Sequence, residues 1–175
     1  MKIVVIIVCL LSVLSIKSCK NQEDNLIESA LVKPDDYLVF GYIGLGRRCG
    51  ADVIYKIQDG KLYADTTKSF CKDQESYQFS GYQLPVSEYN KAKVFVNKFP
   101  VELTKESSKT FGCPGCADGG MFFIQFKMSG QEQKTWRIDD AVFRSDNDVL
   151  NQPFPAYLAK YGQAVANVFS EIKYQ

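Results

Sequence analysis

The chain has 175 residues, enough for one domain with a hydrophobic core. Its 21 basic and 20 acidic side chains give a formal net charge of +1, so charge offers no argument for a nucleic-acid partner. The absence of histidine excludes Ser-His-Asp and Cys-His catalytic arrangements and the HExxH zinc site. No other catalytic constellation stands out, so we expect a non-enzymatic protein that needs no cofactor.

The first residues have the pattern of a secretory signal peptide. Lys2 supplies one positive charge, and the run from Ile3 to Ile16 is apolar apart from two serines and Cys9. A helix that spans a bilayer needs about 20 apolar residues, so this run is short for a membrane anchor. The pattern therefore predicts a leader that is removed during export.

The end of this leader, Ile16-Lys17-Ser18-Cys19, resembles a bacterial lipobox, although Lys17 replaces the usual small residue. The resemblance implies cleavage before Cys19 and acylation of its sulfur, which makes residues 1–18 a lipoprotein signal peptide. Acyl chains on Cys19 would then hold the protein on a lipid bilayer.

A polar segment at residues 19–33 follows and is predicted to be a flexible tether. Within it, Lys20 precedes the adjacent acids Glu23 and Asp24. This order resembles the export signal of surface lipoproteins in the Bacteroidota. The resemblance implies a cell-envelope location, as an outer-membrane lipoprotein exposed at the surface.

Residues 34–175 are predicted to form a single globular domain of the α+β class. We expect an antiparallel sheet of hairpins with two helices packed on one face. Runs that are rich in aromatic and β-branched residues, or that place apolar residues on one face of the pleat, predict the strands, which are Tyr37–Gly44, Ala51–Ile57, Lys61–Asp65, Met121–Met128 and Gln133–Ile138. Asp59-Gly60 has the composition of a hairpin turn, and Ser129-Gly130 predicts a second turn.

Two segments have apolar residues at helical spacing. The first opens at Leu84-Pro85-Val86-Ser87, with Ser87 expected as the N-cap, and ends at Pro100. The second runs from about Pro155 to Lys173. Residues 66–83 and 105–110 are predicted to be loops, with a short strand expected near Tyr77 to Phe79.

Four cysteines lie in the predicted domain: Cys49, Cys71, Cys113 and Cys116. In an exported chain they are candidates for disulfides, and four cysteines allow three pairings that the sequence leaves open. A zinc site is a second interpretation, but only Cys113 and Cys116 form a CxxC pair, whereas four-cysteine zinc sites usually have two such pairs. A thiol–disulfide redox couple at Cys113-Pro114-Gly115-Cys116 is the third.

The surroundings of this CxxC pair favour a structural role. Reactive thiolates are stabilised by a helix N-terminus and by positive charge, but here Ala117-Asp118-Gly119-Gly120 and a predicted strand follow. We therefore predict disulfides that hold loops around the sheet. Bridges from Cys49 or Cys71 to the motif would close long loops and add about 2–4 kcal/mol each, whereas a Cys113–Cys116 bond would add less.

Three segments resemble one group of exported lipoproteins of the Bacteroidota that have no characterised activity. They are residues 50–57 (GADVIYKI), residues 59–63 (DGKLY) and residues 112–120 (GCPGCADGG). The resemblance implies export and a Cys-Pro-x-Cys-Ala-Asp-Gly-Gly loop, and it implies no mechanism. The sequence therefore predicts an envelope lipoprotein with a binding or structural role, and an exported redox protein that uses Cys113 and Cys116 is the alternative.

Overall fold

The structure is a computed structural model of the whole chain, and it describes residues 31, 33–44, 54–65, 70, 79, 81–116, 119–144 and 154–173. The predicted signal peptide, Cys19, Cys49, Cys71 and most of the predicted tether lie outside these residues. None of the described helices has the length and apolar character that a membrane span requires. Leu31, within the predicted tether, is buried in the main hydrophobic core.

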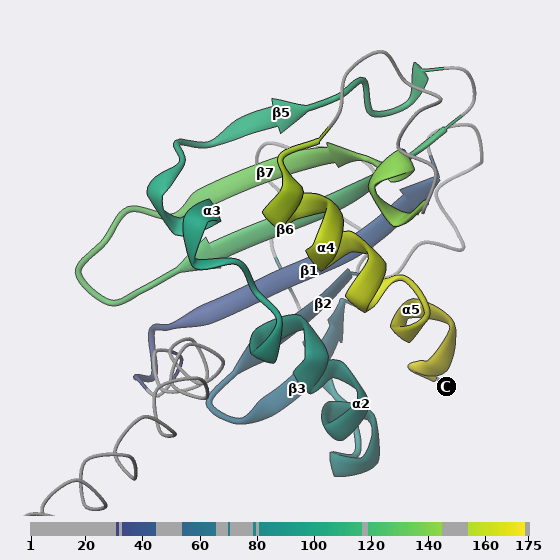
Figure 1. Cartoon of the computed structure of the whole chain (residues 1–175). Helices are drawn as coiled ribbons and strands as arrows, with labels where there is room; N and C mark the ends of the chain where they lie inside the picture. Colours follow the sequence, from purple (N-terminus) through teal and green to yellow (C-terminus); the bar gives the residue numbers. More distant parts are fainter. Residues whose placement is uncertain are drawn as a thin grey trace, which may run out of the picture.

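The domain is built on a seven-stranded sheet in the order β4-β3-β2-β1-β6-β7-β5 (Figure 1). All neighbouring strands are antiparallel except β5 and β7, which are parallel. The strands are β1 (Tyr37–Gly44), β2 (Ile54–Gln58), β3 (Lys61–Asp65), β4 (Gly81–Gln83), β5 (Lys109–Phe111), β6 (Gly120–Lys127) and β7 (Lys134–Asp139). The predicted α+β class with a mainly antiparallel sheet is therefore confirmed.

The two faces of the sheet follow from residue alternation along β1 and β6, which pair over the whole length of β1. Leu38 and Phe40 face the larger core, together with Phe122, Ile124 and Phe126. Val39, Ile43, Met121 and Phe123 lie on the other face in a smaller cluster. Successive side chains of β6 therefore contribute to opposite faces of the sheet.

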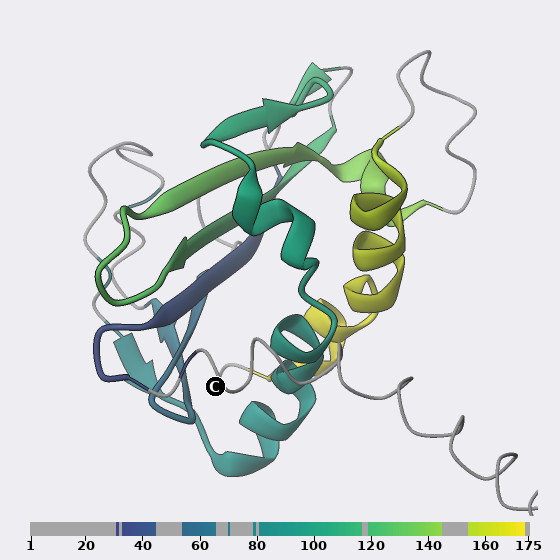
Figure 2. The same ribbon diagram turned by 60° about the vertical axis from the view of Figure 1, so that its left-hand side comes forward.

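The helices supply the other half of the larger core, and Figure 2 shows them gathered beside the sheet. They are α2 (Val86–Asn97), α3 (Val101–Lys105), α4 (Ala156–Val165) and α5 (Val168–Glu171), and a 3₁₀ helix, η4 (Asp140–Phe143), follows β7. Phe95 of α2 stacks on Phe40 with ring centroids 3.8 Å apart, and Phe169 of α5 lies edge-on to Phe95 at 5.0 Å. These ring contacts join both helical regions to the Leu38–Phe40 face of the sheet.

The predicted helical segments are present, but their ends differ from the prediction. Ser87 is not the N-cap, because α2 begins at Val86 after Pro85 and no side chain caps it. Pro100 follows the first helix as predicted and also precedes the short helix α3, which the sequence did not reveal. The second predicted helix is divided into α4 and α5 at Ala166-Asn167.

Both edge strands of the sheet lie where the sequence predicted loops. β4 and β5 have three residues each, which is too short for alternation to show. β4 pairs with β3, and its Gly81 sits so close to the Phe79 ring that a Cβ atom there would lie 2.4 Å from it. Phe79 itself lies outside any strand, and the rest of the short strand expected near Tyr77 to Phe79 falls outside the described residues.

A buried carboxylate ties the C-terminal end of the described chain to α2. Glu88 accepts hydrogen bonds from the Lys91 ammonium at 2.8 Å and from the backbone N–H of Lys173 at 2.8 Å. The hydrogen bond from Lys91 has the largest effect in holding the pKa of Glu88 below its usual value, and the bond from the Lys173 N–H adds to it. The Lys91 ammonium also donates to the Glu171 carbonyl at 2.9 Å, so one ion pair fixes α5 against α2.

The register defines the two ends of the sheet. Gly44, Gly120 and Asp139 lie at one end, where β1, β6 and β7 meet the Cys113–Cys116 loop. Tyr37 and Gln58 lie at the other end, and there the Gln58 amide donates to the Pro34 carbonyl. The chain therefore enters the domain at the end of the sheet opposite the cysteine loop.

Candidate functional site: the Cys113–Cys116 loop

The cysteine loop connects the edge strand β5 to the central strand β6. Gly112 and Gly115 adopt positive φ angles of 72° and 81°, which a residue with a side chain rarely adopts. The Cys116 N–H donates to the Cys113 carbonyl at 3.0 Å, and the Gly119 N–H donates to the Cys116 carbonyl at 3.0 Å. Successive backbone hydrogen bonds thus shape the described parts of this loop.

Asp139, the last residue of β7, holds the start of the loop. One carboxylate oxygen accepts from the Cys113 N–H at 3.1 Å, and the other accepts from the Ala141 N–H at 2.9 Å and so caps η4. Gly112 packs so closely that a Cβ atom there would lie 2.6 Å from the Cβ of Asp139. A buried aspartate therefore joins the loop to the end of the sheet.

Asp140 holds the end of the loop in the same way. Its carboxylate accepts from the Gly120 N–H at 2.8 Å and from the Tyr42 hydroxyl at 3.1 Å. The Tyr42 ring lies over Gly120, where an added Cβ atom would be 2.4 Å from the hydroxyl. Arg144 lies 3.9 Å from Asp140 and balances part of its charge.

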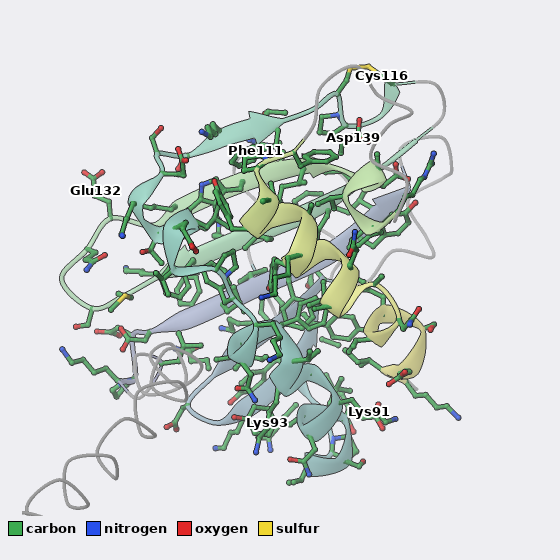
Figure 3. All side chains as sticks on the ribbon, in the orientation of Figure 1. Lys91, Lys93, Phe111, Cys116, Glu132 and Asp139 are labelled. Carbon is green, nitrogen blue, oxygen red and sulfur yellow. A yellow bond between two sulfur atoms is a disulfide. The ribbon has the colours of Figure 1, made fainter. Side chains whose placement is uncertain are left out.

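Cys113 and Cys116 form a disulfide with each other (Figure 3). Both residues are exposed, and the bond lies above Asp139 at the margin of the molecule. This bond closes the smallest loop that any two of the four cysteines could close. The pairing of Cys49 and Cys71 falls outside the described residues.

The chemistry of this site favours a stable disulfide over a reactive thiol pair. A reactive cysteine is stabilised as a thiolate by a helix N-terminus or by nearby positive charge. Here a short turn contains Cys116, and the Cys113 N–H is already bonded to the Asp139 carboxylate. The negative charges of Asp139 and Asp140 oppose a thiolate at the same place.

The zinc interpretation has no geometric support within the described residues. No group of three or more Cys, Asp or Glu side chains in these parts of the chain is arranged to hold a metal ion. Cys113 and Cys116, as a disulfide, offer no thiolate ligands.

The anchoring residues of the loop were not recognised in the sequence. Asp139 and Asp140 directly follow the predicted Gln133–Ile138 strand, and Tyr42 lies within the predicted Tyr37–Gly44 strand. Their partners are far along the chain, since 26 residues separate Asp139 from Cys113 and 98 separate Asp140 from Tyr42. A pair of acids directly after a strand was the available signal, because such side chains can accept from backbone N–H groups at the sheet end.

We expect that loss of the disulfide will leave the fold intact. From the loop-closure entropy of the unfolded chain, a disulfide across so short a loop should stabilise the domain by about 2 kcal/mol. The hydrogen bonds to Asp139 and Asp140 remain when both sulfur atoms are replaced. The double variant Cys113→Ser/Cys116→Ser should therefore lose no more than about that free energy of unfolding, measured by urea denaturation. Asp139→Ala is the matched comparison, because it removes the anchor and keeps the disulfide. Complete unfolding of the double serine variant would contradict this account of the loop.

Comparison with protein-family models, with curated proteins and with solved structures finds no match to this chain. The resemblance to exported lipoproteins therefore remains an expectation from the sequence.

Proposed function

We propose that the chain is a lipid-anchored protein of the cell envelope whose domain has a non-enzymatic binding or structural role. The anchor is Cys19, which follows the apolar leader and the lipobox-like Ile16-Lys17-Ser18. In this proposal the residues between Cys19 and the buried Leu31 connect the lipid to the domain, and the outer membrane is the bilayer. No nucleic acid takes part.

The observation that supports this proposal most is the exposed disulfide between Cys113 and Cys116. An exposed disulfide is stable where thiols are oxidised, as in the bacterial envelope, and rare where they are kept reduced. Its loop is held at both ends by carboxylates, which suits a fixed structural element. Export and a structural disulfide are therefore consistent with each other and with the leader.

The anchor is tested by labelling cells with a fatty-acid analogue that carries an alkyne. The wild-type chain is expected to take up the label and to sediment with membranes, because acyl chains on Cys19 bury in the bilayer. Cys19→Ala should lose the label entirely, and Cys9→Ala, which changes a cysteine inside the leader, should keep it. Equal labelling of the wild type and Cys19→Ala would refute the anchor.

A thiol–disulfide exchange protein is the second candidate function, and one observation favours it. The two cysteines of the CxxC motif pair with each other and are exposed, so a thiolate of another protein can reach either sulfur. The attack would form a mixed disulfide with one cysteine and release the other as a thiolate. A second thiol of the partner would then attack the mixed disulfide, which oxidises the partner to a disulfide and leaves both cysteines reduced. The adjacent carboxylates disfavour that released thiolate, and for this reason we place exchange second.

Reduction of insulin by a thiol donor distinguishes the two functions. We expect the purified domain to accelerate the reaction no more than the Cys113→Ser/Cys116→Ser variant does. If Asp139→Asn and Asp140→Asn together raise the rate, the carboxylates are what suppress exchange. Rapid turnover by the wild type that disappears in Cys116→Ser would overturn the structural role and establish the redox function.

A further inference from the structure

We infer that the corner formed by β4 and the start of α2 contacts the lipid bilayer and orients the tethered domain on it. This inference rests on the proposed anchor at Cys19. The corner is defined by Tyr82, Val86, Asn90 and Lys93, and this set is called the β4–α2 corner below.

Exposed apolar side chains gather at this corner. Tyr82 is 57% exposed and Val86 is 70% exposed, which are the two highest values among large hydrophobic residues of the described chain. Tyr42, at 37%, is the third exposed large hydrophobic residue of the described chain, but it lies at the cysteine-loop end of the sheet, where its hydroxyl is bonded to Asp140. Single exposed apolar residues are common on soluble proteins, but these two lie within five residues of each other. Tyrosine is also a residue that favours the boundary between lipid headgroups and water.

The charge at the corner is suited to a membrane surface. Asn90 and Lys93 lie on the same flank of α2 as Val86, and the Lys93 ammonium is 5.1 Å from the centre of the Tyr89 ring. The acid of this helix, Glu88, is buried and already bonded to Lys91 and to the Lys173 N–H. Lys93 therefore leaves a positive charge on the flank of α2 that carries Val86, and Figure 3 labels it beside that helix.

The position of the corner fits a lipid anchor. Gln58 contacts Pro34 where the chain enters the domain, and Gln58 pairs with Lys61 at the start of β3. The Leu84 N–H, just before α2, donates to the Leu62 carbonyl at this same end of the sheet. Since neighbouring strands are about 4.8 Å apart, β4 lies about 15 Å from β1.

The length of the tether keeps the domain near the bilayer. Leu31 is the first described residue and is buried, and it follows Cys19 by twelve residues. Twelve residues span at most about 40 Å when fully extended. An anchored domain is therefore always close to lipid, where a second, weak contact is favoured by high effective concentration.

The inference is tested with a tryptophan reporter on the lipidated full-length protein, reconstituted in vesicles of phosphatidylethanolamine and phosphatidylglycerol with brominated acyl chains. The reporter Asn90→Trp is exposed and one helical turn from Val86, whereas the native Trp136 is fully buried. We expect bromine to quench the reporter and expect Tyr82→Ser/Val86→Ser to abolish that quenching. Thr110→Trp, exposed on the opposite edge strand β5, is the control and should not be quenched.

The possible results separate this inference from the proposed anchor. If the protein floats with vesicles only when Cys19 is present and neither reporter is quenched, the anchor stands and the corner does not touch lipid. If the wild type and Cys19→Ala fail equally to float, the anchor itself is wrong. Equal quenching at Asn90→Trp and Thr110→Trp would also contradict a defined orientation. A blue shift of the Asn90→Trp emission with protein concentration, without vesicles, would assign the corner to a second copy of the chain.

Discussion

Phe95→Ala is expected to lower the free energy of unfolding by about 3–5 kcal/mol, because it leaves a cavity at the centre of the core. Phe95 is fully buried and stacks on Phe40 of β1, with Phe122 of β6 and Phe169 of α5 around it. Its carbonyl also accepts from the buried Tyr161 hydroxyl at 2.9 Å, so α2 and α4 meet at this residue. One side chain thus joins the sheet to both helical regions.

Urea denaturation followed by far-UV circular dichroism measures this loss. Val86→Ala is the matched control, since it also removes apolar atoms from α2 but at a position that is 70% exposed. Its effect should stay within about 0.5 kcal/mol. Equal effects of the two substitutions would mean that Phe95 does not lie in the core as the structure has it.

Gly162→Ala is expected to destabilise the domain by about 1–3 kcal/mol or more, although alanine is ordinarily the better helix former. Gly162 lies in α4 against η4, where an added Cβ atom would be 2.4 Å from the Val142 carbonyl oxygen and 2.8 Å from its Cγ2. Since a backbone oxygen is the closest atom, α4 must move away from η4 to admit the methyl group. This contact also bears on the cysteine loop, because η4 begins at Asp140.

The neighbouring residue provides the control for Gly162. Gln163 is exposed in the same helical turn, so Gln163→Ala changes helix propensity without adding a contact. Thermal unfolding should give a lower midpoint for Gly162→Ala and an unchanged or higher midpoint for Gln163→Ala. An unchanged midpoint for Gly162→Ala would show that α4 and η4 are farther apart than the structure indicates.

The elements that the sequence predicted are those with strong local patterns. Lys61–Asp65 was predicted with its observed bounds, and Asp59 and Gly60 both have positive φ as a tight hairpin turn requires. β6 and β7 were predicted because β6 is a run of aromatic and aliphatic residues and a Ser-Gly turn separates the two strands. In each case neighbouring residues along the chain carry the information.

The elements that were missed depend on distant partners. β5 is a three-residue strand with two exposed residues, and it forms only because β7, more than twenty residues later, offers a parallel edge. The prediction that Ser87 is the N-cap was wrong because the helix already begins at Val86, with Pro85 at the N-cap position. The anchors of the cysteine loop belong to the same class, since the fold of the sheet is what brings Asp139 and Asp140 to Cys113 and Gly120.

The central claim is an exported protein that is anchored through Cys19 and carries a structural Cys113–Cys116 disulfide. Mass spectrometry of the protein extracted from membranes, digested without reduction, tests both parts in one measurement. We predict an N-terminal peptide that begins at Cys19 and carries acyl chains, together with a peptide in which Cys113 and Cys116 are linked to each other. An unmodified peptide that contains Ser18-Cys19 uncleaved, or free thiols at Cys113 and Cys116, would contradict the account.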